Sequence, residues 1–173
     1  MKKIAKFMKV SKEQFVKDFL DAIPEERGFN EEKAAAVYDA ITLPKRATAG
    51  SAGYDFFSPV TFTLHPGQSI KMPTGIRAKM EEGWVLSLYP RSGLGFKYRM
   101  QLNNTVGIID SDYFDADNEG HIICRLTNDS NENRSLQIEQ GKGFVQGIFT
   151  EFGICEDDDA DGIRTGGFGS TTK

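Results

Sequence analysis

The chain has 173 residues, of which 39% are hydrophobic and 27% charged, as is typical of a globular protein of one domain plus a modest appendage. The formal net charge of −4 argues against a non-specific nucleic-acid binder, because such proteins are usually basic. The two cysteines, Cys124 and Cys155, lack the spacing of a zinc site or of a disulfide framework.

The first part of the chain shows a helical pattern. Ser11, followed three residues later by Gln14, resembles a capping box, and apolar residues then recur at helical spacing. Asn30, followed by two glutamates, begins a second helix, because negative charge is favoured near a helix N-terminus. We therefore expect residues 1–42 to form a leading segment and a two-helix extension. This extension is expected to pack on the rest of the protein through Phe15, Phe19 and Val37.

Residues 43–155 show short apolar runs that are separated by glycine and proline. Many short strands between turn residues are typical of all-β barrels and jelly rolls. The fold class expected is therefore mainly β, a β-barrel or jelly roll with an N-terminal two-helix extension. The expected strands include Val60–Leu64, Ser69–Met72, Trp84–Tyr89, His121–Thr127 and Phe144–Phe152.

Residues 156–173 differ from the rest of the chain. The acidic run Glu156–Asp161 precedes a glycine-rich end with one aromatic residue. Such a segment has too little apolar area to order itself, so we expect an arm that a ligand orders. The acidic run itself is interpreted as a solvated linker or as a cation site, although it lacks the ligand pattern of an EF-hand.

Two segments carry most of the chemistry that the residues suggest. In Pro90–Gly95, an arginine, a serine and two glycines supply donors suited to phosphate, although the spacing is not that of a P-loop. In Asn104–Tyr113, Gly107 gives a planar base access to a backbone edge, Asp110 can orient a water molecule as general base, and Tyr113 can cover a sugar.

Three further segments are weaker by themselves. Ala52–Asp55 presents an aspartate after a glycine, Gly141–Gln146 resembles a turn that leads into a strand, and Gly166–Thr171 offers glycines, hydroxyls and an aromatic ring. Taken alone, each is also compatible with an ordinary turn or a tail.

Taken in order, the five segments AGYDF, PRSGLG, NTVGIIDSDY, GKGFVQ and GGFGST resemble the motifs of the homotrimeric dUTP diphosphatase (dUTPase) family. The resemblance covers about Ile41 to Lys173. It implies a jelly-roll trimer that hydrolyses dUTP to dUMP and pyrophosphate with Mg²⁺, through attack of water on the α-phosphorus. This activity limits uracil in DNA and supplies dUMP for dTTP synthesis. It also implies active sites shared between chains.

The resemblance assigns a role to each motif residue. Asp110 is the catalytic residue that polarises the attacking water, and Tyr113 packs on the deoxyribose and excludes UTP. Asp55 lies near Mg²⁺ through a metal-bound water. The uracil edge is read by Asn104 and by the backbone of Gly107, Ile108 and Ile109. Phosphate oxygens are held by Arg91, Ser92, Gly93 and Gln146. The nucleotide is covered by Arg164, Phe168, Gly169, Ser170 and Thr171.

Three positions depart from the family pattern. The acidic insertion Phe114–Glu119 precedes Gly120, so the β-hairpin expected around Tyr113 has an altered geometry. Arg164 lies one residue closer to the aromatic residue of the final motif than usual. Gly143 stands where the family often has arginine, so a phosphate or structural contact is expected to be missing there.

Two alternative functions are compatible with parts of the sequence. A dCTP deaminase of the same fold needs a glutamate five residues after Gly120, where this chain has Arg125. A non-catalytic nucleotide sensor or partner-binding protein could use the helical extension and the acidic insertion for docking. Nucleic acid is not expected as a partner, because the net charge is negative. A membrane is not expected either, because no apolar run is long enough to span a bilayer. No signal peptide is evident, so we expect a cytoplasmic protein, encoded by a cell or by a virus that acts in its host.

Overall fold

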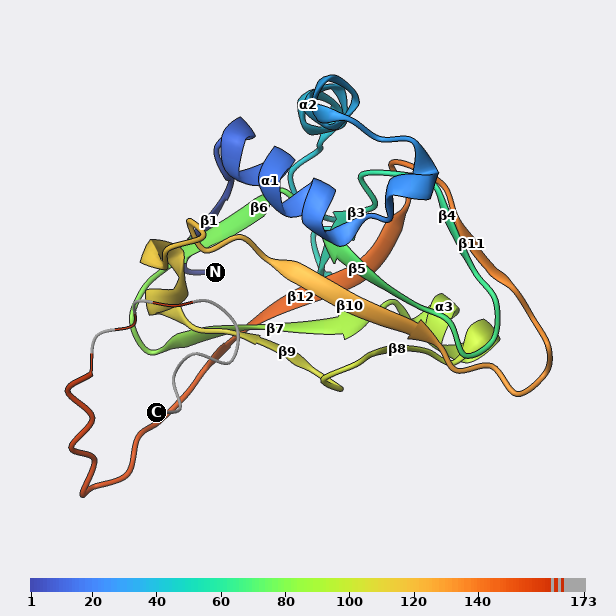
Figure 1. Cartoon of the computed structure of the whole chain (residues 1–173). Coiled ribbons are helices and arrows are strands. Elements are labelled where there is room, and N and C mark those ends of the chain that lie inside the picture. The colour runs from blue at the N-terminus through green and yellow to red at the C-terminus, as the bar shows by residue number, and fades with distance from the viewer. Residues whose placement is uncertain (163, 165, 167–173) are drawn as a thin grey trace.

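A computed structural model of the chain describes residues 1–162, 164 and 166. It shows a mainly β body with two helices lying across one side (Figure 1). The helices are α1 (Lys12–Ala22), α2 (Glu31–Ala40) and α3 (Ser92–Tyr98), with the 3₁₀ helices η1 (Glu25–Arg27) and η2 (Ser111–Asp115). The strands are β1 (Ala5–Lys9), β2 (Lys45–Arg46), β3 (Tyr54–Phe57), β4 (Phe62–Leu64), β5 (Ser69–Pro73), β6 (Ile76–Met80), β7 (Trp84–Pro90), β8 (Met100–Leu102), β9 (Gly107–Ile109), β10 (Ile123–Asn128), β11 (Leu136–Ile138) and β12 (Gly143–Glu151).

The strands of the described residues pair in four separate sheets. One has five strands in the order β2-β3-β12-β7-β9, one has three in the order β5-β10-β8, and the pairs β1-β6 and β4-β11 complete the set. The mainly β fold with N-terminal helices is confirmed, but the expected closed barrel is not formed among these residues. A barrel closes only if every strand has two neighbours, whereas β1, β6, β4 and β11 each pair with one.

The five expected strands are confirmed as β4, β5, β7, β10 and β12. In β4 and β10 the side chains alternate between more and less buried positions, because successive side chains of a strand point to opposite faces, whereas β7 has three consecutive buried residues, Leu86 to Leu88. The glycines and prolines that separated the runs in the sequence lie mostly between the strands. Local composition was therefore enough to place these elements.

Both expected helices are present and begin at the expected caps, Ser11 and Asn30, whose side-chain oxygens accept hydrogen bonds from the first helical turn. Phe15, Phe19 and Val37 are buried in the same core as the strands, as predicted. Truncating a buried phenylalanine typically costs about 3–5 kcal/mol, so the two helices are firmly packed on the body.

The leading segment forms a strand that the sequence did not indicate. β1 pairs antiparallel with β6 along its whole length, from Ala5 opposite Met80 to Lys9 opposite Ile76. Phe7 of β1 belongs to an aromatic cluster whose contacting ring centroids are 5.2–5.9 Å apart. The aromatic cluster consists of Phe7, Tyr54, Phe56 and Phe149. The N-terminal residues are thus joined to the body by a ladder and by aromatic packing.

The predicted capping box at the start of α1 is only half correct. The backbone N–H of Gln14 donates to Ser11 Oγ at 3.1 Å, but the Gln14 side chain donates to Asp18 rather than back to Ser11. The reciprocal contact comes from the acidic insertion instead. Glu119 accepts hydrogen bonds from the Ser11 N–H at 2.7 Å and from the Ser11 hydroxyl at 2.6 Å.

Two carboxylates that hold α1 should make stability depend on pH. Burial tends to raise the pKa of Asp18, but hydrogen bonds from His121 and Gln14 outweigh it and lower the pKa below 3.8. A hydrogen bond from Ser11 lowers the pKa of Glu119 below 4.5. A lowered carboxyl pKa stabilises the fold above the ordinary pKa, and this contribution disappears as the pH falls through the folded-state pKa.

We therefore expect the free energy of unfolding to decrease on acidification from about pH 6 to about pH 3, and to decrease less in Asp18→Asn. Urea unfolding at a series of pH values measures both slopes. The same slope in wild type and variant would show that Asp18 is not one of the responsible groups.

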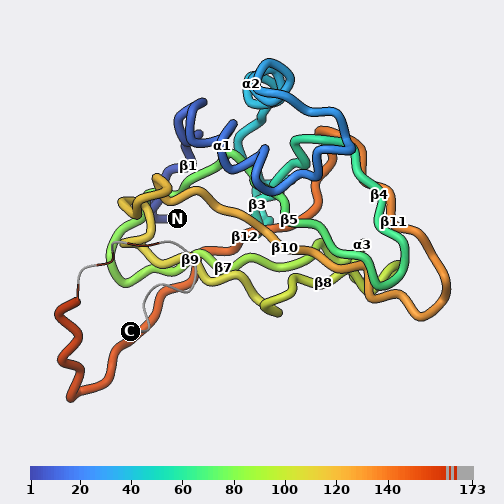
Figure 2. The backbone as a smooth tube through the Cα atoms, in the orientation of Figure 1, coloured from blue at the N-terminus to red at the C-terminus, as the bar shows by residue number. Residues whose placement is uncertain are grey.

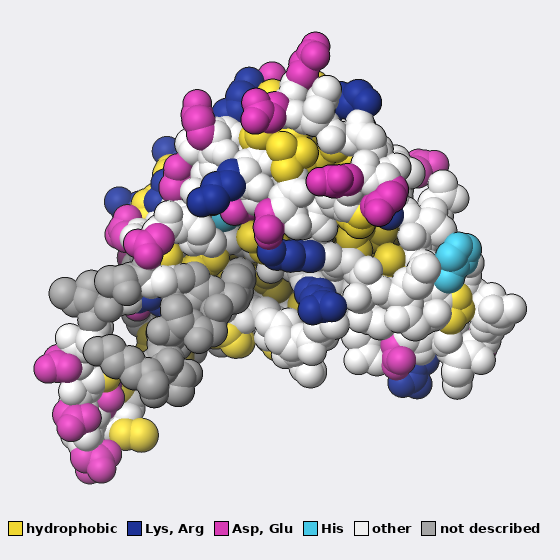
Figure 3. All heavy atoms as spheres, in the orientation of Figure 1, with side chains coloured by type: hydrophobic (Ala, Val, Ile, Leu, Met, Phe, Trp, Pro, Cys, Tyr) yellow, Lys and Arg dark blue, Asp and Glu magenta, His cyan; other side chains and the backbone are white. Residues whose placement is uncertain are grey.

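The surface over α1 and α2 carries side chains of both charges (Figure 3). Within the described residues, no helix is both long and apolar enough to cross a membrane. The acidic run at residues 156–161 is exposed along its length, and the tube in Figure 2 shows it projecting away from the body.

Candidate functional site

Residues from three of the five motifs meet at one end of the five-stranded sheet. Asp55 lies on β3, directly opposite Gln146 on β12. Arg91 follows β7, and its Nε lies 3.1 Å from Asp55 Oδ1. Arg91 Nη1 also donates to the carbonyl oxygen of Gly143 at 3.2 Å, while Gln146 Nε2 donates to the carbonyl of Pro90. We call these residues, with the start of α3, the phosphate half of the site.

Two glycines make room for this cluster. A Cβ added to Gly53 would lie 2.7 Å from Gln146 Oε1, and one added to Gly143 would lie 2.8 Å from Arg91 Nη1. Real Cβ atoms essentially never approach so closely. At Gly143, which departs from the family pattern, the Arg91 side chain therefore fills the space that a larger side chain would need.

The segment Pro90–Gly95 is a turn that enters a helix. Ser92 and Gly93 form the first turn of α3, which has no side-chain cap at its N-terminus. Both residues are exposed, so a ligand can approach them from solvent.

The second set of motif residues begins on β9. We call β9 and η2 together the base half of the site. β9 is the edge strand of the five-stranded sheet, with Gly107 opposite Leu88 of β7. A Cβ on Gly107 would lie 3.1 Å from the Leu88 Cβ, so this glycine is also needed for close packing between the strands. Ile108 is 50% exposed, and Asn104 is exposed in the turn before the strand.

Tyr113 lies in η2, and Asp110 is the N-cap residue of that helix, so the β-hairpin expected here is wrong. Successive 3₁₀ hydrogen bonds run from Tyr113 N–H to Asp110 O and from Ala116 N–H to Tyr113 O. The following strand, β10, pairs with β5 and β8 and leaves β9 without a hairpin partner. Burial raises the pKa of Tyr113, so its hydroxyl stays protonated and donates to the carbonyl of His121 at 2.8 Å.

Arg164 contacts carboxylates in this structure. Its guanidinium lies 2.5 Å from Asp110 Oδ2 and 2.9 Å from Asp112 Oδ1, and it is centred 5.7 Å from the ring of Tyr113. Its side chain is 15% exposed. The other residues expected to cover the nucleotide lie outside the described residues: Phe168, Gly169, Ser170 and Thr171.

The helices that follow Asp110 and Arg91, η2 and α3, lie toward opposite ends of β7 (Figure 1), while β9 pairs with the middle of that strand. Asp110 follows Ile109, which pairs with Leu86 in the first half of β7, whereas Arg91 follows the last residue of that strand. At a rise of about 3.3 Å per residue, the two are roughly 15–20 Å apart along the strand. One chain therefore does not bring all of the expected site residues together.

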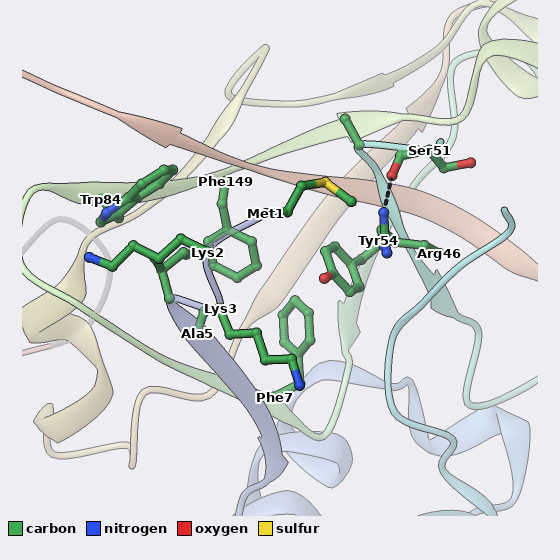
Figure 4. A pocket seen from close by; sticks show the side chains of 12 residues that line it. Met1, Lys2, Lys3, Ala5, Phe7, Arg46, Ser51, Tyr54, Trp84 and Phe149 are labelled. Atoms are coloured by element: carbon green, nitrogen blue, oxygen red, sulfur yellow. Dashed lines mark hydrogen bonds between the residues drawn. The ribbon is translucent and has the colours of Figure 1, made fainter. Parts of the chain in front are cut away.

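A pocket of about 730 Å³ lies elsewhere, between β1 and the aromatic cluster (Figure 4). Its walls include Phe7, Tyr54, Trp84 and Phe149, with Lys2 and Lys3 at the side. It contains none of the expected catalytic or binding residues, so we place the site at the motif residues instead.

Several polar residues near the base half were not singled out in the sequence. Asp112 shares Arg164 with Asp110, and Asp18 of α1 contacts the buried ring of His121. The sequence signal for Asp112 was its place inside the third motif. For Asp18 and His121 there was none, because they are 103 residues apart.

Comparison with known proteins gives concordant matches. Residues 39–172 match the dUTPase family model. The chain is 42% identical over 134 residues to the deoxyuridine 5'-triphosphate nucleotidohydrolase of Lactococcus lactis subsp. lactis (strain IL1403), covering 76% of this chain and 88% of that protein. It is 37% identical over 139 residues to the protein of the same description from Chromobacterium violaceum, with the same two coverages, 76% and 88%.

Solved structures agree with this result. The dUTPase from Streptococcus mutans superposes with a TM-score of 0.61 at 31% identity, covering 87% of this chain and 98% of that one. The dUTPase from phage phi11 of S. aureus has a TM-score of 0.56 at 23% identity, covering 70% of this chain and 90% of that one, which supports the fold alone.

Proposed function

This chain belongs to the dUTPase family, and we propose that its active site is assembled from more than one copy of the chain. The protein is a dUTP diphosphatase, which converts dUTP to dUMP and pyrophosphate. The observation that carries the proposal is the separation of Arg91, after the last residue of β7, from Asp110, beside the first part of that strand. Groups that act on one phosphorus must lie within hydrogen-bonding reach of it, about 3 Å.

In the base half, each residue has a distinct task. Asp110 orients and polarises the attacking water, since its carboxylate is 46% exposed and can accept a proton. Tyr113 packs on the deoxyribose and leaves no room for a 2′-hydroxyl. The uracil edge is read by Asn104 and by the open backbone edge of Gly107, Ile108 and Ile109, where cytosine would leave donors or acceptors unpaired.

In the phosphate half, charge that develops on the phosphoryl oxygens is met by fixed donors. Arg91 is already held in place by Asp55 and by the carbonyl of Gly143, so little reorganisation is needed when phosphate binds. Hydroxyl, backbone and amide donors come from Ser92, Gly93 and Gln146.

The residues of this half fit a bound Mg²⁺. The described residues contain no group of three or more potential metal ligands, but Mg²⁺ is usually held by one or two carboxylates together with waters and substrate phosphates. Asp55, partly exposed beside Arg91, can supply that carboxylate through a water. When bound, the ion neutralises charge on the phosphates. A dUTPase from phage phi11 of S. aureus is described as coordinating a structural Mg(II) ion.

The final motif closes the site in this proposal. Arg164, Phe168, Gly169, Ser170 and Thr171 cover the nucleotide and exclude bulk water. In the present structure Arg164 is bound to Asp110 and Asp112. It must leave Asp110 before it can contact phosphate, and its departure also leaves that carboxylate available to the water. The assembly proposed is a homotrimer, and the location proposed is the cytoplasm.

Complementation between two inactive variants tests the shared site. Arg91→Ala removes a group from the phosphate half, and Asp110→Asn removes one from the base half. Each variant alone should be nearly inactive. If the halves of one site come from different chains, a random mixture of the two variants restores about one quarter of the sites, because each half is intact with a probability of one half.

The measurement is pyrophosphate release from dUTP by co-expressed, differently tagged variants, with a mass measurement of the assembly. A mixture no more active than its parents would show that both halves act within one chain. Wild-type protein assayed in parallel separates this result from a lack of dUTP hydrolysis altogether.

A further inference from the structure

The acidic insertion fastens helix α1 to the base half of the site. Glu119 accepts two hydrogen bonds from Ser11 at the start of α1. Two residues further on, His121 Nδ1 lies 2.5 Å from Asp18 Oδ2, two helical turns along α1 from Ser11. One continuous segment therefore holds α1 at two points.

The ring of His121 is fixed from both sides. It is fully buried, with 0% exposure. Gly75 N–H donates to its Nε2 at 2.8 Å, so Nε2 carries a lone pair and the proton resides on Nδ1, where it is donated to Asp18. Asp18 of the extension thus determines the tautomer and orientation of the ring.

The same segment positions Tyr113. The Tyr113 hydroxyl donates to the backbone carbonyl of His121 at 2.8 Å and accepts from Asn118 Nδ2 at 2.8 Å. Between them, Gly120 has a φ of +67°, and a Cβ there would lie 2.6 Å from the carbonyl oxygen of Tyr113. Backbone movement at His121 is therefore transmitted directly to the phenol ring.

We propose that His121, oriented by Asp18, is a positioning residue that sets where the Tyr113 ring lies against the deoxyribose. The N-terminal extension thereby contributes to the discrimination of dUTP from UTP. This inference rests on the proposed contact of Tyr113 with the deoxyribose. A helix that only stabilised the fold would affect both nucleotides alike. A helix that sets the ring position changes their ratio, because only UTP carries the excluded 2′-hydroxyl.

The test compares kcat/KM for dUTP and for UTP in Asp18→Ala. We expect the ratio of the two to fall about five- to tenfold, the effect of losing one oriented hydrogen bond, through a higher kcat/KM for UTP, with kcat for dUTP changed less than about twofold. Asp18→Asn, whose Oδ1 can still accept from Nδ1, should restore most of the ratio.

Asp21→Ala is the matched control. It removes the ion pair of Asp21 with Lys71, at 2.9 Å, which joins the same helix to β5 but does not lead to Tyr113. The ratio should stay at the wild-type value. An unchanged ratio in Asp18→Ala, or an equal fall in Asp21→Ala, would overturn the proposal.

If Asp18→Ala does not fold, Asp18→Glu keeps the charge and the acceptor but displaces His121 by about one methylene. The ratio of kcat/KM for dUTP to that for UTP should also fall in this variant. A ratio equal to that of the wild type would again overturn the proposal. Wild-type protein that does not discriminate dUTP from UTP would instead refute the sugar role of Tyr113 itself.

Discussion

Asp110→Asn should lower the turnover of dUTP by about 10²–10⁴-fold, the usual contribution of a general base. The amide has the same shape as the carboxylate but cannot take a proton from the attacking water. The fold should be retained, because Asp110 is half exposed and the amide oxygen of the variant can still accept the hydrogen bond from Arg164. Steady-state pyrophosphate release and a thermal unfolding curve measure the two effects separately.

Asp112→Asn provides the matched control for this variant. Asp112 shares Arg164 with Asp110, so the control weakens the same contact without touching the proposed water-orienting group. Turnover by Asp112→Asn should stay within a few-fold of wild type. Similar losses in both variants would indicate that the ion pair, rather than the base, is what matters, and near-normal turnover by Asp110→Asn would remove Asp110 from its proposed role.

Removal of residues 166–173 should lower turnover on the order of 10²-fold, comparable to the loss of one transition-state donor or more, while the assembly persists. In the proposed mechanism these residues cover the nucleotide and exclude bulk water, which strengthens every electrostatic contact in the site. The deletion leaves Arg164 and its two carboxylate partners in place, so it separates covering of the nucleotide from the contacts of that arginine.

Turnover at saturating dUTP and the mass of the assembly in solution are the measurements. A truncated protein that hydrolyses dUTP at the normal rate would contradict the covering role. Loss of the assembly together with activity would show that these residues hold copies together instead. Phe168→Ala offers a milder variant, expected to raise the KM for dUTP if the ring stacks on the base.

The sequence alone indicated the elements whose signals are local. The strands β4, β5, β7, β10 and β12 follow from short apolar runs between turn formers. The caps Ser11 and Asn30 follow from side chains that bond to the backbone three residues away. The order of five short motifs was enough to indicate the family, because each motif is a contiguous stretch of chain.

Other features were visible only in the tertiary structure, because they join residues that are distant in the sequence. The pairing of β1 with β6 is one, and the division of the described strands into four separate sheets, so that no barrel closes among them, is another. Another is the reciprocal cap of α1, which comes from Glu119, 108 residues away, instead of from Gln14. Local propensity carries no information on such pairs, since their contact depends on how the whole chain packs.

The site divides in the same way. Residue types and spacing indicated chemistry for Arg91, Asp110 and Tyr113, and the family resemblance added roles for Asp55 and Gln146; the family comparison agrees with the activity they imply. Only the tertiary structure decided where they lie: Arg91 beside Asp55 after the end of β7, Asp110 beside the first part of that strand, and helix α1 held by the segment that follows η2. Distances across a sheet follow from strand pairing and register, which contiguous motifs do not encode.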